Sequence, residues 1–270
     1  MGQLLVDAAN NGVRRIIVGL GGSATNDAGC GAAAAAGVKF YNAAGEVFIP
    51  TGGTLCDVAD IDLTGMDPAL KAVEIITMCD IDNPMYGPTG AAYIFAPQKG
   101  ADPDMVAELD SGLRSLAKVM ADKLGADDPD IPGAGAAGAM GMGMLVFFGS
   151  RLQMGIQTVL DVTAFEQLAA DCDYIITGEG KLDSQSLRGK VVIGVAQRAK
   201  ALGKPVIAIV GGADDAEIAA AYDLGVTAVF PINRLPQDFS VSRYKSEENL
   251  CWTADNILRL LAAEQRRANQ

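Results

Sequence analysis

The sequence predicts an α/β fold built on a parallel sheet. Its 270 residues are 50% hydrophobic, which is enough to bury one large core or two ordinary ones. In the C-terminal part, apolar runs alternate with helical stretches in the order Tyr174–Thr177, Gly189–Leu202, Val206–Val210, Asp214–Asp223 and Ala228–Ile232. Strands that alternate with helices at this spacing form parallel βαβ units, so the fold class follows from these runs.

The remaining segments predict a second, mixed α/β unit and a closing helix. The expected elements are a first helix with Leu4, Leu5 and Ala8, a strand Arg15–Gly19, an Ala-rich helix after Asn26, a strand pair around the turn 42–45, a strand 73–80, a helix 103–124, a loop and helix start within 133–143, and an amphipathic helix 246–268 with Leu250, Ile257, Leu258 and Leu261 at helical spacing. The first helix begins at once after Met1 without a capping residue. We interpret this start as a truncated boundary or, equally, as a frayed first helix.

Composition excludes several classes of function. The formal net charge of −12 repels nucleic acid and anionic membranes, and the apolar runs are shorter than the roughly 20 residues that span a bilayer. The five cysteines form no CxxC pair, which favours a reducing cytoplasm over a disulfide framework or a structural zinc site. Because the chain has no histidine, a His-based triad is excluded, and any proton transfer must use Asp, Glu, Lys, Tyr or water.

Two glycine-rich segments are candidate phosphate loops. The first, Gly19–Ala24, follows a strand and fits the loose form of the dinucleotide fingerprint, but the acidic residue expected after the next strand is missing. We expect its backbone N–H groups to lie at a helix N-terminus and to bind an anion, with Gly21, Gly22, Ser23 and Asn26 as candidate ligands, or else to form a capped tight turn. The second, Gly133–Gly138, reads GxGxxG without a preceding strand, so its small residues either admit a phosphate or adenine or allow close helix packing.

Carboxylates follow the predicted strand 73–80. If extended geometry persists, Asp80 and Asp82 project to one face, where they share a Mg²⁺ ion or divide the roles of base and metal ligand. The alternative is an Asx turn before Pro84.

The strongest candidate site is the loop Thr177–Lys190, which we call the charged loop. It leaves a parallel strand at its carboxyl end, where open α/β sheets bind ligands. Glu179 and Asp183 suit a hard cation, whereas Lys181, Arg188 and Lys190 suit phosphate or carboxylate. The alternative is a solvated polar loop. Lys99, on a separate loop, is one more candidate phosphate ligand.

Five motifs in order resemble the bacterial glycerate kinase family, of the glycerate 2-kinase type. They are Gly21–Asp27 (GGSATND), Cys79–Pro84 (CDIDNP), Pro97–Gly100 (PQKG), Pro132–Gly138 (PGAGAAG), and Thr177–Gly180 (TGEG) with Asp183–Lys190. The resemblance runs from the first residues to about Ile232, and five motifs in the right order are far more specific than any one of them.

The resemblance implies a kinase that phosphorylates D-glycerate with ATP and Mg²⁺, most commonly to 2-phosphoglycerate. It also implies two α/β domains, a Rossmann-like domain from residues 1–20 and 166–270 and an inserted mixed domain from 21–165. Members of the family carry a further N-terminal segment about the size of a small domain. We therefore expect that the Rossmann-like domain is incomplete and that this can impair the kinase activity of the chain.

On physical grounds we assign roles within such a kinase. Asp80 accepts the hydroxyl proton, while Lys181, Arg188 and Lys190 hold the substrate carboxylate and the transferring phosphoryl group. Asp82, Glu179 or Asp183 binds Mg²⁺. Of all these residues, Asp80 and Lys181 are the two that we assign as catalytic. Two alternatives remain: a nucleotide-dependent dehydrogenase using Gly19–Ala24, and a non-catalytic module that binds glycerate or nucleotide.

Overall fold

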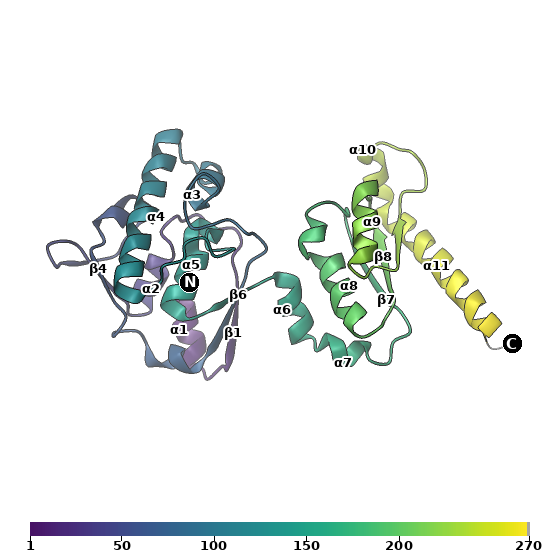
Figure 1. Cartoon of the computed structure of the whole chain (residues 1–270), viewed down its shortest axis with the longest axis horizontal. Helices are drawn as coiled ribbons and strands as arrows, with labels where there is room; N and C mark the ends of the chain where they lie inside the picture. Colours follow the sequence, from purple (N-terminus) through teal and green to yellow (C-terminus); the bar gives the residue numbers. More distant parts are fainter. Residues whose placement is uncertain (269–270) are drawn as a thin grey trace. The chain divides into compact units, whose positions relative to one another are not determined.

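The computed structural model describes residues 1–268 and separates the chain into two compact units, Met1–Gly155 and the part from Ile156 onward (Figure 1). We call them unit 1 and unit 2. Each contains helices and a parallel sheet of three strands. The predicted α/β fold class is therefore confirmed.

Unit 1 is organised around a parallel sheet and a small antiparallel sheet. Strands β1 (Arg15–Gly19), β5 (Glu74–Met78) and β6 (Arg151–Gln153) form the parallel sheet in the order β1-β5-β6. Strands β2 (Lys39–Tyr41), β3 (Val47–Phe48) and β4 (Asp60–Asp62) form the antiparallel one, in the order β3-β2-β4. Between β2 and β3, the Asn42 side chain accepts the N–H groups of Ala44 and Glu46, as expected of the predicted turn.

The helices of unit 1 cover these sheets and supply most of its core. They are α1 (Gly2–Asn10), α2 (Cys30–Ala35), α3 (Ala91–Phe95), α4 (Pro103–Leu124) and α5 (Ala136–Phe148), with 3₁₀ turns η1 (Gly52–Asp57), η2 (Pro68–Ala72) and η3 (Pro97–Lys99). Helix α4 has the bounds that the sequence predicts, because the Asp102 carboxylate caps its first turn and Gly125, with a φ of 70°, ends it. Its buried face carries Leu113, Leu116 and Met120.

Unit 2 contains the predicted βαβ arrangement. Strands β7 (Ile175–Glu179), β8 (Val206–Val210) and β9 (Ala228–Pro231) are parallel in the order β7-β8-β9, and β8 is buried throughout. The helices are α6 (Gly155–Val162), α7 (Phe165–Ala169), α8 (Val191–Ala201), α9 (Asp215–Asp223), α10 (Phe239–Ser242) and α11 (Ser246–Ala268), with turns η4 (Ser186–Arg188) and η5 (Arg243–Lys245). The carboxyl ends of all three strands meet at one edge of the sheet.

The closing helix α11 has the predicted bounds but a narrower apolar contact. Ile257 is 3% exposed and packs with Ile207 and Ile209 of β8, whereas Leu250 and Leu258 are exposed. The helical spacing therefore predicted the helix correctly, but two of its leucines do not reach the core.

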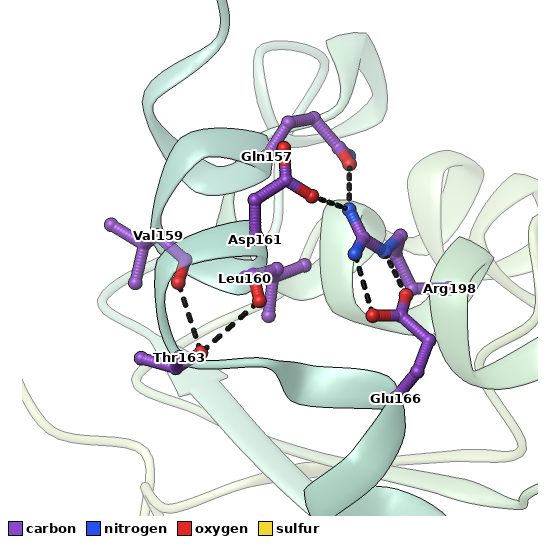
Figure 2. A network of polar contacts seen from close by, with 7 residues as sticks. All are labelled: Gln157, Val159, Leu160, Asp161, Thr163, Glu166 and Arg198. Atoms are coloured by element: carbon purple, nitrogen blue, oxygen red, sulfur yellow. Dashed lines mark hydrogen bonds and ion pairs between the residues drawn. The ribbon is translucent and has the colours of Figure 1, made fainter. Parts of the chain in front are cut away.

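A cluster of polar contacts fastens α6 and α7 to α8. Figure 2 shows the Arg198 guanidinium between the carboxylates of Asp161 and Glu166, with the Gln157 side chain as a further acceptor. The Nη1–Oδ1 distance to Asp161 is 2.7 Å and the Nη2–Oε2 distance to Glu166 is 2.7 Å. Because α8 directly follows the charged loop in the chain, this cluster fixes the helix to which the loop leads.

The division into units differs from the expected domains at two places: residues 156–165, expected in the inserted domain, lie in unit 2, and residues 1–20 lie in unit 1. Residues 1–20 were grouped with 166–270, yet β1 is hydrogen-bonded along its length to β5, with Ile17 opposite Ile76. They are therefore part of the same unit as 21–155.

Nothing in the described residues 1–268 forms a helix that is apolar and long enough to cross a membrane.

Candidate functional site

One cavity of unit 1 brings together five of the candidate site residues of that unit, namely Gly21, Gly22, Ser23, Asp80 and Lys99. Its volume is about 450 Å³, and we call it the Asp80 cavity. It lies where β1 and β5 end and is lined by Gly19–Ser23, Met78–Ile81, Phe95, Gln98, Lys99, Ala136, Ala137 and Gly155. The candidate anion ligands Gly21, Gly22, Ser23 and Lys99 thus share a cavity with the candidate base Asp80.

Lys99 is fixed at the wall of this cavity by neutral oxygens. Its ammonium group donates to Ser23 Oγ at 2.9 Å and to the carbonyl oxygen of Thr25 at 2.6 Å. Burial lowers the pKa of Lys99, and the nearby charge of Asp27 opposes that shift. An ammonium group held by neutral acceptors keeps its positive charge available to an incoming anion.

Asp80 is exposed at the mouth of the same cavity. Strand β5 ends at Met78, so Asp80 and Asp82 lie in irregular chain rather than in the extended segment that would point them to one face. The Asp80 Oδ1 atom accepts the N–H of Gly155 at 2.8 Å. Asp82 is exposed and does not line the Asp80 cavity.

A second cavity of unit 1, of about 460 Å³, lies beside Asn26, and we call it the Asn26 cavity. Its lining is Ala24–Asp27, Thr51–Gly53, Ala96, Lys99–Ala101, Met105, Glu108 and Leu109. Lys99 therefore lines both the Asn26 cavity and the Asp80 cavity. Asn26 is 7% exposed, and neither its amide nitrogen nor its amide oxygen has a hydrogen-bond partner among the described residues. Leaving a buried polar group unpaired costs about 1–3 kcal/mol, so this amide is held in place at the expense of stability.

The start of α5 fixes the backbone around Asn26. A Cβ atom on Gly138 would lie 2.1 Å from the carbonyl oxygen of Thr25 and 2.7 Å from Asn26 Cα. Ala137, Gly138 and Ala139 all have positive φ (55°, 72° and 65°), which is strained for alanine. The sequence analysis left two interpretations of the small residues in 133–138, which were approach of a phosphate or adenine and close packing. At Gly138 the structure shows close packing, against the backbone of Thr25 and Asn26.

The glycine loop does not lie at a helix N-terminus, which corrects that expectation. Helix α2 begins only at Cys30. The Asp27 carboxylate already accepts the N–H groups of Gly29 and Gly31, at 3.0 and 3.1 Å, so the first turn of α2 is satisfied by the chain itself. Any anion at Gly21–Ser23 would depend on the loop and on Lys99 instead.

A cavity of unit 2 lies at the carboxyl ends of its strands. Its volume is about 720 Å³, and we call it the Glu179 cavity. It is lined by Ile176–Lys181, Ile209–Gly212, Ile232, Asn233, Phe239, Ser242, Arg243, Ser246 and Leu250. A volume of this size is typical of a small-molecule site, and this edge of a parallel sheet is where such sites occur.

Glu179 ends β7 inside this cavity. Its Oε1 atom is buried without a hydrogen-bond partner in residues 1–268, although the residue as a whole is half-buried. Burial raises the pKa of the Glu179 carboxyl, and the Ser186 hydroxyl and Lys190 oppose that shift. An unpaired carboxylate oxygen of this kind is suited to a cation.

The cations of the charged loop differ in how they are held. Lys181 is exposed and forms an ion pair with Asp214 at 2.9 Å, which raises its pKa. The Lys190 ammonium donates to Gln185 Oε1 at 2.6 Å, and Lys190 itself precedes the first turn of α8. Arg188 is exposed at the end of η4. Only Lys181 of these three lines the Glu179 cavity.

Asp183 stabilises the charged loop internally. Its Oδ1 atom accepts the N–H groups of Gln185 and Ser186, at 2.9 and 3.3 Å. Within residues 1–268, no group of three or more His, Cys, Asp or Glu side chains is gathered as a metal site. Mg²⁺ in kinases commonly takes one or two carboxylates and completes its shell with phosphate oxygens and water. The single carboxylate of Glu179 would therefore be enough for such a site.

The sequence analysis did not assign the residues that line the Glu179 cavity from the last part of the chain to a site. Phe239, Arg243 and Leu250 come from α10, η5 and α11, where no motif stands out. Two glycines of this cavity stand at recognisable places in the sequence, since Gly178 lies near the end of β7 and Gly211 directly follows β8. A Cβ on Gly178 would lie 2.3 Å from Ile209 O, and one on Gly211 would lie 2.3 Å from Gly180 O. These glycines allow the strand ends to approach closely.

Comparison with known proteins gives a consistent result. The model of the family described as "Glycerate kinase family" matches residues 1–262. A glycerate kinase of Bacillus cereus is 45% identical over 256 residues, which are 95% of this chain and 67% of that protein. A glycerate 2-kinase of Escherichia coli is 42% identical over 267 residues, which are 99% of this chain and 70% of that protein. A crystal structure from Salmonella typhimurium, titled as a glycerate kinase 2, superposes with a TM-score of 0.81 at 41% identity, covering 98% of this chain and 69% of that one.

Proposed function

The chain belongs to the glycerate kinase family, and from that premise we propose that it phosphorylates D-glycerate with ATP and Mg²⁺ to give 2-phosphoglycerate. The observation that carries the proposal is the Asp80 cavity, in which a candidate base, a glycine loop and Lys99 line one space. Phosphoryl transfer depends mainly on positioning and on charge, which suits a chain without histidine.

In the proposed reaction, the acceptor hydroxyl oxygen bonds to the γ-phosphorus of ATP while the bond from that phosphorus to the β,γ-bridging oxygen breaks. ADP leaves, and the hydroxyl proton passes to Asp80. The carboxylate of a 2-hydroxy acid is attached to the carbon that bears the hydroxyl, so it must occupy the same cavity as the base. Lys99 lines that cavity, and this favours Lys99 over the charged loop as the partner of the substrate carboxylate.

The charged loop is then left to the nucleotide. Lys181, Arg188 and Lys190 would hold phosphate oxygens, since each presents a cation near the carboxyl edge of the sheet of unit 2. Glu179, with its unpaired oxygen, is the best-suited ligand for Mg²⁺ among the three candidates Asp82, Glu179 and Asp183. When bound, Mg²⁺ would neutralise charge on the phosphate oxygens.

The proposal includes a cytoplasmic location and no nucleic-acid or membrane partner. The support is compositional: five cysteines without a CxxC pair suit a reducing compartment, and the net charge of −12 disfavours polyanions.

The decisive test is ADP formation that depends on D-glycerate, measured in a coupled assay, with ³¹P NMR to identify the phosphorylated hydroxyl. We expect turnover and a 2-phosphoglycerate signal. Absence of ADP formation would overturn the proposal. Oxidation of hydroxy acids, seen at the nicotinamide absorbance band, would indicate the dehydrogenase instead, and calorimetric binding without turnover would indicate a non-catalytic module.

A further inference from the structure

The amide of Asn26 is a buried polar group that the fold itself does not use. Asn26 is 7% exposed and lines the Asn26 cavity, yet its Nδ2 and Oδ1 atoms have no hydrogen-bond partner among the described residues. Buried side-chain amides are paired in most proteins, so one without a partner, placed at a cavity, indicates a ligand that supplies the missing bonds.

The chemistry of the amide restricts that ligand. Nδ2 is a donor and Oδ1 is an acceptor, and both need a partner. A carboxylate or a phosphate would satisfy only the donor, and an apolar group would satisfy neither. A hydroxyl group both donates and accepts, so it matches the two empty positions of Asn26.

The place of Lys99 indicates which hydroxyl this is. Lys99 lines both the Asn26 cavity and the Asp80 cavity. Glycerate has one carboxylate and two hydroxyls on three adjacent carbons. A carboxylate bound to Lys99 would leave one hydroxyl for the Asp80 cavity and the other for the Asn26 cavity.

We propose that Asn26 determines substrate specificity by binding the hydroxyl of glycerate that is not phosphorylated, so that the site selects small dihydroxy acids over monohydroxy acids. The inference rests on the proposed function. It assigns three chemical groups of one substrate to three side chains of unit 1.

The surroundings hold Asn26 rigidly enough for this task. The Ala28 N–H donates to the carbonyl oxygen of Gly138 at 3.0 Å, and Gly138 contacts the backbone of Thr25 and Asn26 so closely that no side chain fits there. Gly52 is also close to this backbone, since a Cβ on it would lie 3.1 Å from Asn26 O. A site that is built to bond a hydroxyl in advance discriminates strongly against a substrate that lacks it.

The experiment compares D-glycerate with the deoxy analogue that keeps the phosphorylated hydroxyl. This is D-lactate if the 2-hydroxyl is phosphorylated and 3-hydroxypropanoate if it is the 3-hydroxyl. In the unmodified protein we expect kcat/KM for the analogue to be lower by a factor of about 100 or more. In Asn26→Leu we expect kcat/KM for glycerate to fall by a similar factor while that of the analogue changes little, because leucine has the same branching and no polar atoms.

Thermal unfolding of the same variant separates a functional from a structural role. If Asn26 serves the substrate, Asn26→Leu removes an unpaired buried amide, and its Tm should equal or exceed that of the unmodified protein. Asn10→Leu, at an exposed asparagine in α1, is the matched control and should change neither the Tm by more than a few degrees nor the discrimination between substrates.

Two outcomes would overturn the inference. One is an unmodified protein that phosphorylates the deoxy analogue with a kcat/KM within tenfold of that for glycerate, a result that requires no variant. The other is an Asn26→Leu variant that retains full discrimination. Turnover of glycerate without discrimination would contradict this inference alone, whereas absence of glycerate-dependent ADP formation would contradict the proposed function.

Discussion

The two lysines of the candidate sites are held in opposite ways. Lys99 in unit 1 is partly buried and donates to Ser23 Oγ and Thr25 O, both neutral, and burial lowers its pKa. Lys181 in unit 2 is exposed and paired with the Asp214 carboxylate, which raises its pKa. The charge of Lys99 is therefore available to a ligand, whereas a ligand of Lys181 must first compete with Asp214.

This difference reverses the ranking that the sequence suggested. The charged loop attracted attention because three cations lie close together in it, and Lys99 was one cation on a separate loop. A count of charges along the chain does not show which of them is neutralised in the fold. We expect Lys99 to contribute more to anion binding than Lys181, and the predictions below test this from the largest effect to the smallest.

The largest effect is expected for Lys99→Met, which keeps the length of the side chain and removes its charge. Without the ammonium group the substrate carboxylate loses its partner, and we expect kcat/KM for D-glycerate to fall by about 100- to 1000-fold. Steady-state kinetics at saturating ATP measure this. Lys123→Met, which breaks an exposed ion pair with Asp60, is the control and should stay within about twofold. A loss of less than tenfold in Lys99→Met would place Lys99 outside the site.

A smaller loss is expected for Asp80→Asn. The asparagine oxygen can still accept the Gly155 N–H, so the local structure should persist while the proton acceptor is lost. Base catalysis contributes moderately when the transition state is loose, and we expect kcat to fall by about 10- to 100-fold with little change in KM. An unchanged kcat would remove Asp80 from the proton transfer.

Local signals explain what the sequence could predict and what it could not. Helix α4 could be predicted from Pro103 to Leu124 because the residues that begin and end it, Asp102 and Gly125, directly flank it in the sequence. The pairing of Lys181 with Asp214 joins segments that follow two different strands, and the Asn26 backbone lies against Gly138, which is more than 100 residues away in the chain. Both are tertiary facts, so residue spacing carries no record of them.

Lys181 and its partner allow a direct test of the comparison. If Lys181 holds a phosphate group of ATP, Lys181→Ala should lower kcat/KM for ATP by about tenfold, whereas Asp214→Asn should leave it unchanged or raise it, because the lysine is released from its competitor. If the pair only ties the loop to α9, both variants should have the same effect. Equal losses in the two variants would therefore remove Lys181 from the site.

The opposite pKa shifts predict an opposite response to alkaline pH. Lys99 titrates below the ordinary lysine value of 10.5, so it loses its proton, and with it the substrate carboxylate, before an ordinary lysine would. KM for glycerate should then rise severalfold as the pH approaches that value from below. Lys99→Arg should move this limb to higher pH, since arginine stays protonated. In Lys181→Arg the limb should not move, because Lys181 titrates above 10.5.

The smallest effect on activity is expected for Arg198→Met, which acts on the support of the charged loop rather than on a ligand. Arg198 bonds Asp161 and Glu166, and its side chain is 23% exposed, so the loss of these contacts should lower the free energy of unfolding by about 1–2 kcal/mol. Denaturant unfolding measures this change. Arg259→Met breaks a pair with Asp255 whose arginine side chain is 75% exposed, and it should cost less than about 0.5 kcal/mol. Because α8 remains packed through Val192, Ile193 and Ala196, kcat/KM should change by no more than about twofold in either variant. A large loss of activity in Arg198→Met alone would mean that the charged loop depends on this cluster for its catalytic geometry. The packing of α6 and α7 on α8 would then matter for activity as well as the two lysines.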